Sequence, residues 1–395
     1  MSFLDKHIDT AEKFIQKFDG RSPFHLYLKQ YFKQEKKHGS KDRKQISHVC
    51  YAVLRLGKSF LQLSFKSQFQ IAHFIQHEEP GIWSFLYEKT WIEGWSKVLE
   101  ERIKFIQSIH HGFNVSSVFP IANISGLINN KEAFIQSHLY QPNVFIRLRP
   151  GCHGRVEAAL SKKIISFQYI HENTILLPPS VDLSEVEGLN NAFVIQDISS
   201  QQTAKCIDYV AQHFPNHKPI KFWDCCAASG GKTLLAFDRL KHMDITVTDI
   251  RSAMLNNLHN RFKAAGILSY NHSTIDLTKP PFRLPHKKYD CIICDAPCTG
   301  SGTWSRTPEQ LRYFNEDAIS DYTKLQHTIL QNIIPFLAPK GYLLYITCSV
   351  FKEENEDQIA ASLNDYDISI LASEYFEGAA YKGDTMYACL LQLHN

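Results

Sequence analysis

The stretch Asp224-Cys-Cys-Ala-Ala-Ser-Gly-Gly-Lys-Thr233 decides the fold of this 395-residue chain. It follows the apolar run 219–223, so an acidic residue ends a strand and two glycines lead into a helix. Glycines let a ligand approach the helix N-terminus, where free backbone N–H groups point outward. A Walker loop needs a glycine where Cys226 stands, and the dinucleotide pattern G-x-G-x-x-G is missing. The stretch therefore favours a tight loop for an uncharged or zwitterionic ligand.

Apolar, strand-like runs alternate with helical segments on the C-terminal side of the chain. The runs span 219–227, 245–250, 273–277, 289–297 and 341–349. Such alternation predicts a parallel sheet with crossover helices, and strands apolar on both faces are typical of a sheet covered on both sides. The fold class expected here is α/β, with a doubly wound, Rossmann-like domain.

An acid ends four of these runs: Asp224, Asp249, Asp276 and Asp295. Ligands of open α/β sheets bind at the carboxyl ends of the strands, although a single acid there can also serve as a helix N-cap. Asp249, at the end of the second strand, could accept hydrogen bonds from two ribose hydroxyls. An adenosine-containing cofactor without phosphates fits these features, and S-adenosylmethionine is the candidate.

Composition sets broader limits. With 44% apolar and 21% charged residues, the chain is globular rather than disordered, and its length predicts two or three units. Ten scattered cysteines indicate a reducing compartment, which favours the cytoplasm. The start of the chain has no secretory h-region and no run of 18 apolar residues occurs, so we expect neither export nor membrane spanning. The net charge of +3 does not by itself indicate nucleic acid.

The N-terminal part of the chain predicts two further units. Residues 1–130 show helical apolar spacing, 131–195 read as a small ferredoxin/RRM-like α/β module, and 196–395 hold the alternating strands and helices. Residues 29–45 hold seven Lys/Arg against two acids, which suits either a solvated helix face or a phosphate-contacting patch. Arg147 and Arg149 alternate along a strand, so both would project from one face, toward RNA or water.

Two cysteines follow strands at the ligand edge, namely Cys298 and Cys348. Methylating carbon 5 of cytosine requires a thiolate to add at carbon 6, and a second group must then help remove the carbon 5 proton. A pair of thiols suits this chemistry, and Asp295 could hydrogen-bond the N3/N4 edge of a base that is single-stranded or flipped out. Cys291 and Cys294 lie within a strand and are expected to pack there, because residues one and four of a strand face opposite ways and make a poor zinc half-site.

The motifs DCCAASGGKT, VTDI, IDL, DAPCTGSG and YITCSVFKEENE, in this order, resemble the RNA cytosine-C5 methyltransferase family of the RsmB (Fmu/Sun) type. The segment QDISSQ at 196–201 is also similar, and 22–60 resembles the helical RNA-binding region of rRNA-modifying members more weakly. The resemblance implies that Cys348 is the nucleophile and Cys298 the release cysteine. It implies a cofactor site made by Cys226, Ala227, Ala228, Ser229, Gly230, Gly231, Lys232, Asp249, Asp276 and Asp295. Ser229 departs from the family, which usually has proline there, and this departure is expected to loosen the loop.

The function expected from these features is transfer of a methyl group from S-adenosylmethionine to cytosine C5 in RNA. 16S rRNA is the first candidate substrate and tRNA the second, with the chain acting as a monomer without a metal ion. A catalytically silent RNA-binding or ribosome-assembly factor on the same fold is an alternative, which retention of both cysteines disfavours. An exocyclic-amine methyltransferase would need an Asn/Asp-Pro-Pro-aromatic loop, whereas this chain has Asp295-Ala-Pro-Cys298.

Overall fold

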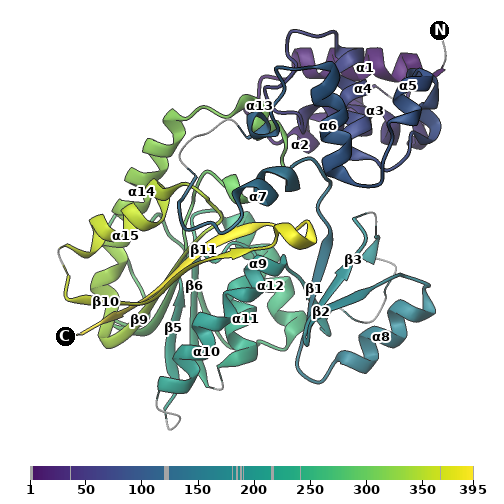
Figure 1. Ribbon diagram of the computed structural model, residues 1–395. Helices are drawn as coiled ribbons and strands as arrows, with labels where there is room; N and C mark the ends of the chain where they lie inside the picture. The colour runs from purple at the N-terminus through teal and green to yellow at the C-terminus, as the bar shows by residue number, and fades with distance from the viewer. Residues whose placement is uncertain are drawn as a thin grey trace. The chain divides into compact units, whose positions relative to one another are not determined.

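The computed structural model describes residues 3–35, 37–119, 124–179, 181–183, 186, 189, 191–214, 218–240, 242–364 and 366–394. They fall into two compact units (Figure 1). The first comprises Met1–Ala122, Asn130–Gln141 and Thr303–Glu316, and the second Asn123–Asn129, Pro142–Gly302 and Asp317–Asn395. The predicted boundaries near residues 130 and 195 therefore stay a prediction, since the two C-terminal parts share one unit.

The first unit is helical. Its helices are α1 (Phe3–Lys17), α2 (Phe24–Gln34), α3 (Ser40–Leu54), α4 (Phe65–Gln76), α5 (Lys89–Glu93), α6 (Leu99–Ile109), α7 (Lys131–Ser137) and α13 (Glu309–Tyr313), with 3-10 turns at Gly81–Leu86 and Val115–Val118. The apolar spacing seen in the sequence is the buried face: Phe24, Leu28 and Phe32 of α2, and Ile46, Val49, Cys50, Val53 and Leu54 of α3, are all buried. The helical nature predicted for this region is confirmed.

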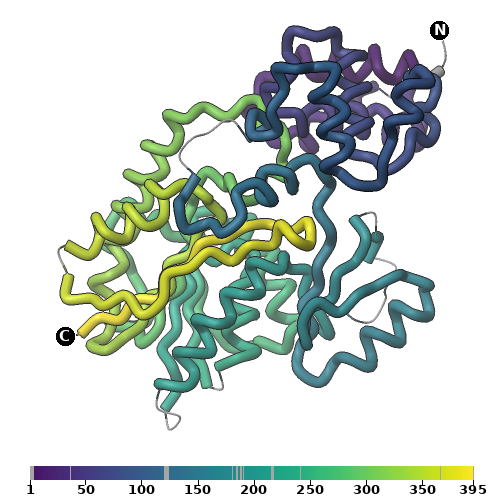
Figure 2. The backbone as a smooth tube through the Cα atoms, in the orientation of Figure 1, coloured from purple at the N-terminus to yellow at the C-terminus, as the bar shows by residue number. Residues whose placement is uncertain are grey.

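The segment Thr303–Glu316, which comes from the C-terminal half of the sequence, packs among these helices (green in Figure 2). Glu309 accepts a hydrogen bond from the backbone N–H of Phe24 at the start of α2 (3.0 Å), and the Tyr313 hydroxyl donates to the carbonyl of Ile15 in α1 (3.0 Å). A helix N-terminus leaves N–H groups without intrahelical partners, so the buried Glu309 carboxylate satisfies one of them. The segment is thus a structural part of the helical unit.

A seven-stranded sheet in the order β10-β11-β9-β8-β5-β6-β7 forms the core of the second unit. The strands are β5 (Ile220–Asp224), β6 (Met243–Asp249), β7 (Asn271–Thr274), β8 (Tyr289–Asp295), β9 (Leu337–Thr347), β10 (Ile368–Glu377) and β11 (Thr385–Leu393). The strands β5 to β9 are parallel, whereas β11 runs antiparallel to both β9 and β10. The strand order reverses between β5 and β8, and ligands of such sheets bind at the carboxyl ends beside that reversal.

Helices cover both faces of this sheet, as Figure 1 shows. One face carries α10 (Ala204–His213), α11 (Gly231–Arg239) and α12 (Ser252–Ala265), and the other α14 (Asp317–Ile333) and α15 (Glu356–Leu363). Side chains of α10 to α12 form one apolar core with inward residues of six strands of the sheet, including Phe222, Val247, Ile293, Leu344, Phe376 and Leu390. The doubly wound, Rossmann-like α/β fold is therefore confirmed.

A smaller antiparallel sheet belongs to the same unit. Its order is β2-β3-β1-β4, from β1 (Val144–Leu148), β2 (Gln168–His171), β3 (Thr174–Leu177) and β4 (Phe193–Ile195), with α8 (His153–Lys162) after β1. Placing the first strand between the third and the fourth is the arrangement expected of a ferredoxin/RRM-like module. Ile146, Leu148, Val156, Leu160 and Ile175 form its core.

All ten cysteines are free thiols. Within the described residues, every helix is too short or too polar to cross a bilayer.

Candidate active site

The glycine loop lies between β5 and α11, where the strand order reverses. Gly230 has φ of 81°, and a Cβ atom there would lie 2.6 Å from a ring carbon of Phe262 and 3.0 Å from Leu258. Glycine is therefore required at this position both by the left-handed backbone and by the close approach of α12. Ala228 also has a positive φ, of 46°. The loop is held in a conformation that exposes the start of α11 to a ligand.

Ser229 stands where the family that the chain resembles usually has proline. A residue of α12 anchors it. The Arg261 guanidinium donates to the Ser229 hydroxyl (2.6 Å) and to the Ser229 carbonyl (2.9 Å). A proline would fix the loop through its own ring, whereas here a charge-assisted pair of hydrogen bonds does so from the neighbouring helix. The expected loosening of the loop is thus offset by Arg261.

Asp249 ends β6 and is buried beside this loop. Its carboxylate accepts from the Ala228 N–H (2.9 Å), the Arg251 N–H (2.8 Å) and the Arg251 guanidinium (3.0 and 3.2 Å). Burial opposes ionisation of Asp249, but these hydrogen bonds outweigh it and lower its pKa. The carboxylate is thus ionised at neutral pH, and its four acceptor positions are filled. Ribose hydroxyls would therefore replace the Arg251 side chain, which is 60% exposed.

Asp224 and Asp276 have different surroundings. The Asp224 carboxylate accepts from the Thr233 hydroxyl (2.6 Å), its other oxygen is buried without a described partner, and burial raises its pKa to about 7. Asp276 accepts from the hydroxyl (2.6 Å) and N–H (3.0 Å) of Thr278 and pairs with Lys279 (3.0 Å), and these contacts lower its pKa to about 2. Asp224 thus ties β5 to α11, and Asp276 forms its own turn. A role for Asp276 in cofactor binding stays a prediction.

The side chains of Lys232 and Asp295 form an ion pair at the carboxyl end of β8. The Lys232 ammonium lies 3.0 Å from an Asp295 carboxylate oxygen, and the Lys232 side chain is only 8% exposed against 31% for Asp295. A lysine that is nearly buried needs such a partner to stay charged. The pair presents the exposed oxygen of Asp295 at the ligand edge, next to the loop that carries Cys298.

The two predicted cysteines come together at the ends of the neighbouring parallel strands β8 and β9. The Cys298 and Cys348 sulfur atoms are 3.3 Å apart, and both residues are partly exposed. The hydrogen bond with Cys348 and burial raise the pKa of Cys298 well above its usual range, so Cys298 is protonated at neutral pH. The Gly302 N–H donates to the Cys348 carbonyl (2.8 Å), and a Cβ at Gly302 would overlap the carbonyl oxygen of Thr385. Glycine therefore permits the close approach of the two cysteine loops.

A buried carboxylate connects these loops, and the sequence did not single it out. Glu354 is fully buried and accepts from the N–H (2.9 Å) and hydroxyl (2.5 Å) of Thr299, from the Ser349 hydroxyl, and from the Gln326 amide (3.1 Å). Thr299 follows Cys298 and Ser349 follows Cys348, so one carboxylate fixes the backbone beside both thiols. An acid in a charged segment gives no sequence signal for burial. Only the fold shows this role.

A second group of thiols lies beneath the glycine loop. The sulfur atoms of Cys225, Cys226 and Cys294 lie within 4.8 Å of one another, and hydrogen bonds from Cys225 and Cys226 lower the pKa of Cys294 to about 6. Cys291 and Cys294 are both buried in β8, which confirms that they pack within the strand. Of the three, only Cys226 is partly exposed.

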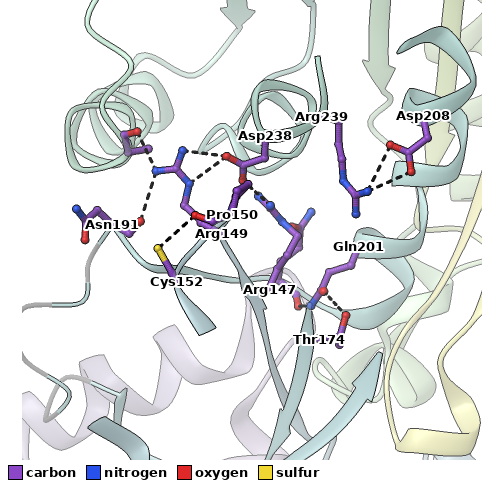
Figure 3. A network of polar contacts seen from close by, with 12 residues as sticks. Arg147, Arg149, Pro150, Cys152, Thr174, Asn191, Gln201, Asp208, Asp238 and Arg239 are labelled. Atoms are coloured by element: carbon purple, nitrogen blue, oxygen red, sulfur yellow. Dashed lines mark hydrogen bonds and ion pairs between the residues drawn. The ribbon is translucent and has the colours of Figure 1, made fainter. Parts of the chain in front are cut away.

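Arg147 and Arg149 do not form the exposed face expected of them (Figure 3). Both pair with Asp238 of α11, at 2.5 and 2.9 Å, and their side chains are only 4% and 12% exposed. Arg147 also donates to Gln196 (2.9 Å), and Arg149 to the carbonyl of Ala265 (2.8 Å). The expectation that they meet RNA phosphates or water is wrong, because they attach the small module to the methyltransferase sheet.

Three features together define a methyltransferase domain. They are the left-handed glycine loop, the buried acid that ends the next strand, and the position of both at the reversal point of a doubly wound sheet. The tight loop and the Asp249 carboxylate fit an adenosine group better than a phosphate, since the loop offers a close backbone approach without the Walker glycine. S-adenosylmethionine is the cofactor of this class of domain. The fit of loop and acid agrees with the cofactor expected from the sequence.

Comparison with known proteins gives a family match for the C-terminal part of the chain. Residues 214–391 match the family model described as 16S rRNA methyltransferase RsmB/F. Ribosomal RNA small subunit methyltransferase B of Proteus mirabilis is 30% identical over 262 residues, and that of Salmonella arizonae 33% over 240. These alignments cover 62% and 59% of this chain but only 59% and 53% of the relatives. The matched part therefore spans little more than half of the relatives' length.

Solved structures resemble this chain in fold, although their sequences differ from it. The structure of PH0851 aligns over 99% of both chains with a TM-score of 0.70 at 18% identity. NSun6 from Pyrococcus horikoshii with SFG covers 68% of this chain and 96% of its own, with a TM-score of 0.58 at 15% identity. At these identities the likeness concerns the fold alone. The alignment with PH0851 extends the likeness in fold from the matched methyltransferase domain to nearly the whole chain.

Proposed function

We propose that this chain methylates carbon 5 of cytosine in RNA, with 16S rRNA as its substrate and S-adenosylmethionine as methyl donor. The observation that carries the proposal is the pair of sulfur atoms 3.3 Å apart at the carboxyl ends of β8 and β9. Methyl transfer to an exocyclic amine needs no thiol, whereas transfer to cytosine carbon 5 needs a nucleophile at carbon 6 and a base for the proton on carbon 5. Two adjacent thiols at the ligand edge suit the second reaction.

The resemblance to the cytosine-C5 methyltransferases assigns the nucleophile to Cys348 and the release step to Cys298. The Cys348 thiolate forms a bond to carbon 6, which makes carbon 5 electron-rich. Bound S-adenosylmethionine would supply an electrophilic methyl group to carbon 5, with its neutral thioether as the leaving group. Cys298, once its own proton has passed to solvent, accepts the proton of carbon 5, the bond between the Cys348 sulfur and carbon 6 breaks, and its electrons return to Cys348 as the carbon 5–carbon 6 double bond re-forms.

Asp295 and Lys232 would bind and orient the base. The exposed Asp295 oxygen can accept a hydrogen bond from the N4 amino group, and from N3 once that nitrogen is protonated in the adduct. Lys232 holds the other oxygen of the carboxylate at 3.0 Å and fixes its orientation. A hydrogen bond that strengthens as the adduct forms lowers the barrier rather than the binding free energy alone. Since the bases of a helix are stacked, the target cytosine must be unpaired or flipped out.

The choice of RNA rests on the relatives. Both curated relatives described above carry ribosomal RNA small subunit in their names, which favours rRNA over tRNA. A catalytically silent assembly factor would not need two thiols in contact, nor a buried carboxylate that fixes both cysteine loops. A cytoplasmic location and a monomeric state accompany this proposal as predictions.

Bisulfite sequencing tests the reaction and the substrate together. rRNA and tRNA from cells lacking the gene would be compared with RNA from cells complemented by the wild type or by Cys348→Ala. We expect one cytosine of 16S rRNA to resist bisulfite conversion only with the wild type. A site in tRNA would redirect the substrate assignment, and the absence of any gene-dependent site in either RNA would contradict the proposed reaction on these RNAs.

A further inference from the structure

Three histidine rings meet inside the helical unit, which carries neither cysteine of the predicted catalytic pair. His48 lies on α3, His73 on the last turns of α4, and His77 directly follows α4 as its C-cap residue. The ring centroids are 4.2 Å apart for His73 and His77, 5.0 Å for His48 and His77, and 5.6 Å for His48 and His73. Helical geometry places His73 and His77 on one face because they are four residues apart. The third ring comes from a different helix.

The ring nitrogens of the three histidines lie close together. Each residue offers one nitrogen, and these three atoms lie within 4.8 Å of one another. A zinc ion bound at about 2.0–2.1 Å to tetrahedrally placed nitrogens separates them by about 3.3 Å. The rings would need to close by about 1.5 Å at most, and the partly exposed rings of His48 and His77 have room to turn.

His73 is already oriented as a ligand. Its Nε2 lies 3.1 Å from the carbonyl oxygen of Pro80, and because a carbonyl only accepts, Nε2 must carry the hydrogen. The lone pair therefore lies on Nδ1, which is buried without a hydrogen-bond partner in a side chain only 3% exposed. Metal-binding histidines characteristically donate their other N–H to a backbone carbonyl. A buried acceptor without a partner destabilises the fold, and a bound cation would remove that penalty.

We propose that His48, His73 and His77 bind a zinc ion that links α3 to the end of α4. The spacing of His73 and His77 is one of those found in zinc sites, and neutral imidazole is the ligand form. The fourth position would hold water, as in other sites with three protein ligands. The inference is independent of the proposed methylation and names a site that the motifs of the sequence did not indicate.

Aromatic side chains form a wall around the rings. His48 stacks near Trp83 (centroids 6.3 Å), and His73 lies within 6.1 Å of both Tyr87 and Trp95. The Trp95 indole N–H donates to the carbonyl of His77 (2.9 Å), which fixes the end of α4. A rigid, apolar shell holds ligand side chains in position and limits the access of water. The positive charge of Arg102 acts on His77 and disfavours a dication there, which the three ring nitrogens must outweigh.

Metal titration of the full chain tests this site. The protein is stripped with a chelator and titrated with Zn²⁺ against a coloured chelator, and the retained zinc is measured by mass spectrometry. The wild type is expected to hold one ion per chain, and His73→Gln and His77→Gln to hold none. His111→Gln, which replaces an exposed histidine of the same unit, should retain the ion. Circular dichroism checks that each variant is folded. If His73→Gln does not fold, His77→Gln tests the site alone, because the His77 side chain is partly exposed.

Cobalt distinguishes this site from the thiol group under the glycine loop. Co²⁺ bound by three imidazoles gives visible d–d absorption without the intense near-ultraviolet band of thiolate-to-cobalt charge transfer. We expect the first spectrum in the wild type and in Cys294→Ala, and its loss in His77→Gln. A charge-transfer band that disappears in Cys294→Ala would place the ion at the cysteines, and unchanged zinc content in folded histidine variants, or no zinc retained by the wild type, would likewise overturn the proposal.

Discussion

At the scale of single residues, the site depends on groups whose ionisation is set by their neighbours. Asp249 is held ionised by the Ala228 N–H and Arg251, and Cys298 is held protonated by Cys348 and by burial. Opposite shifts of this kind are typical of active sites, where each group needs a defined charge. They lead to two predictions, one for cofactor binding and one for the release step.

Replacing Asp249 by alanine should weaken S-adenosylmethionine binding by about 1.5–3 kcal/mol, which is about 10- to 150-fold in Kd. The variant loses the acceptor for the ribose hydroxyls and the anchor of the Ala228 N–H (2.9 Å). Arg251→Ala is the matched control, since it removes only the exposed side chain that ribose would replace, and its Kd should be unchanged or lower. Calorimetric titration measures both, and wild-type affinity in a folded Asp249→Ala protein would show that the loop binds the cofactor without this acid.

The release step should accelerate as the pH rises. Cys298 must be deprotonated to accept the carbon 5 proton, and its raised pKa leaves it protonated at neutral pH, so each unit of increase in pH below that pKa provides about tenfold more thiolate. Single-turnover reactions quenched at pH 7, 8 and 9 should therefore show the covalent RNA–protein adduct decaying progressively faster. Cys298→Ala should show slow decay with no such slope. A wild-type decay rate that is flat with pH would assign proton removal to another group.

At the scale of elements, the parts predicted well from sequence are those whose signal is local. The strands β5, β6, β8 and β9 follow from runs that are apolar on both faces and end in an acid or a cysteine, and the buried stripes of α2 and α3 follow from helical spacing. Boundaries differ by a few residues: β7 is Asn271–Thr274, not 273–277. The antiparallel strands β10 and β11 were not predicted, because no loop motif or terminal acid marks them.

Contacts between distant elements could not be predicted. Arg147 of β1 and Arg149, which follows the end of β1, do point to one partner, but this partner, Asp238, is 91 and 89 residues away on α11. Glu354 reaches Thr299 across 55 residues, and His48 reaches His73 from another helix. A charged residue that is buried and paired has the same sequence signature as one exposed to solvent. The structure was needed to separate the two cases.

The junction between the small module and the sheet should be sensitive to Asp238. Replacing Asp238 by alanine leaves Arg149 and the 4% exposed Arg147 without their counter-charge. Breaking a buried pair in this way lowers the free energy of unfolding by about 3–5 kcal/mol. Asp208→Ala removes the partner of Arg239 in a pair that is 39% and 37% exposed, and should cost less than about 1 kcal/mol. Urea unfolding compares the two variants. Equal, small losses would mean that the arginines are solvated rather than buried.

At the scale of the whole molecule, the chain combines a methyltransferase domain with a helical unit that carries the basic stripe. The stripe, residues 29–45, lies on α2, α3 and the turn between them, with Lys29, Lys33, Lys37, Lys41 and Lys44 exposed and Lys36 outside the described residues. With Arg147 and Arg149 buried, this stripe is the remaining site of those predicted to bind phosphates. Counterion release makes such binding measurable.

Changing Lys33, Lys37 and Lys41 to glutamine should make the plot of log affinity against log salt shallower by about 2, or roughly 0.7 for each phosphate that is no longer neutralised. Changing Lys89, Lys97 and Lys104 to glutamine removes the same charge from exposed positions elsewhere in the helical unit and should alter the slope far less. Filter binding of a 16S rRNA fragment at several salt concentrations gives both slopes. Equal slopes for the two triple variants would identify the stripe as a solvated surface.

The covalent adduct between RNA and protein tests the central claim most directly. Purified wild type, Cys298→Ala, Cys348→Ala and the double variant are incubated with RNA and S-adenosylmethionine and run on a denaturing gel. We predict a shifted band that accumulates only in Cys298→Ala, because attack and methyl transfer proceed there while release is impaired, and no band without Cys348. Trapping in Cys348→Ala instead would reverse the two roles, and full turnover in both single variants would exclude cysteine catalysis.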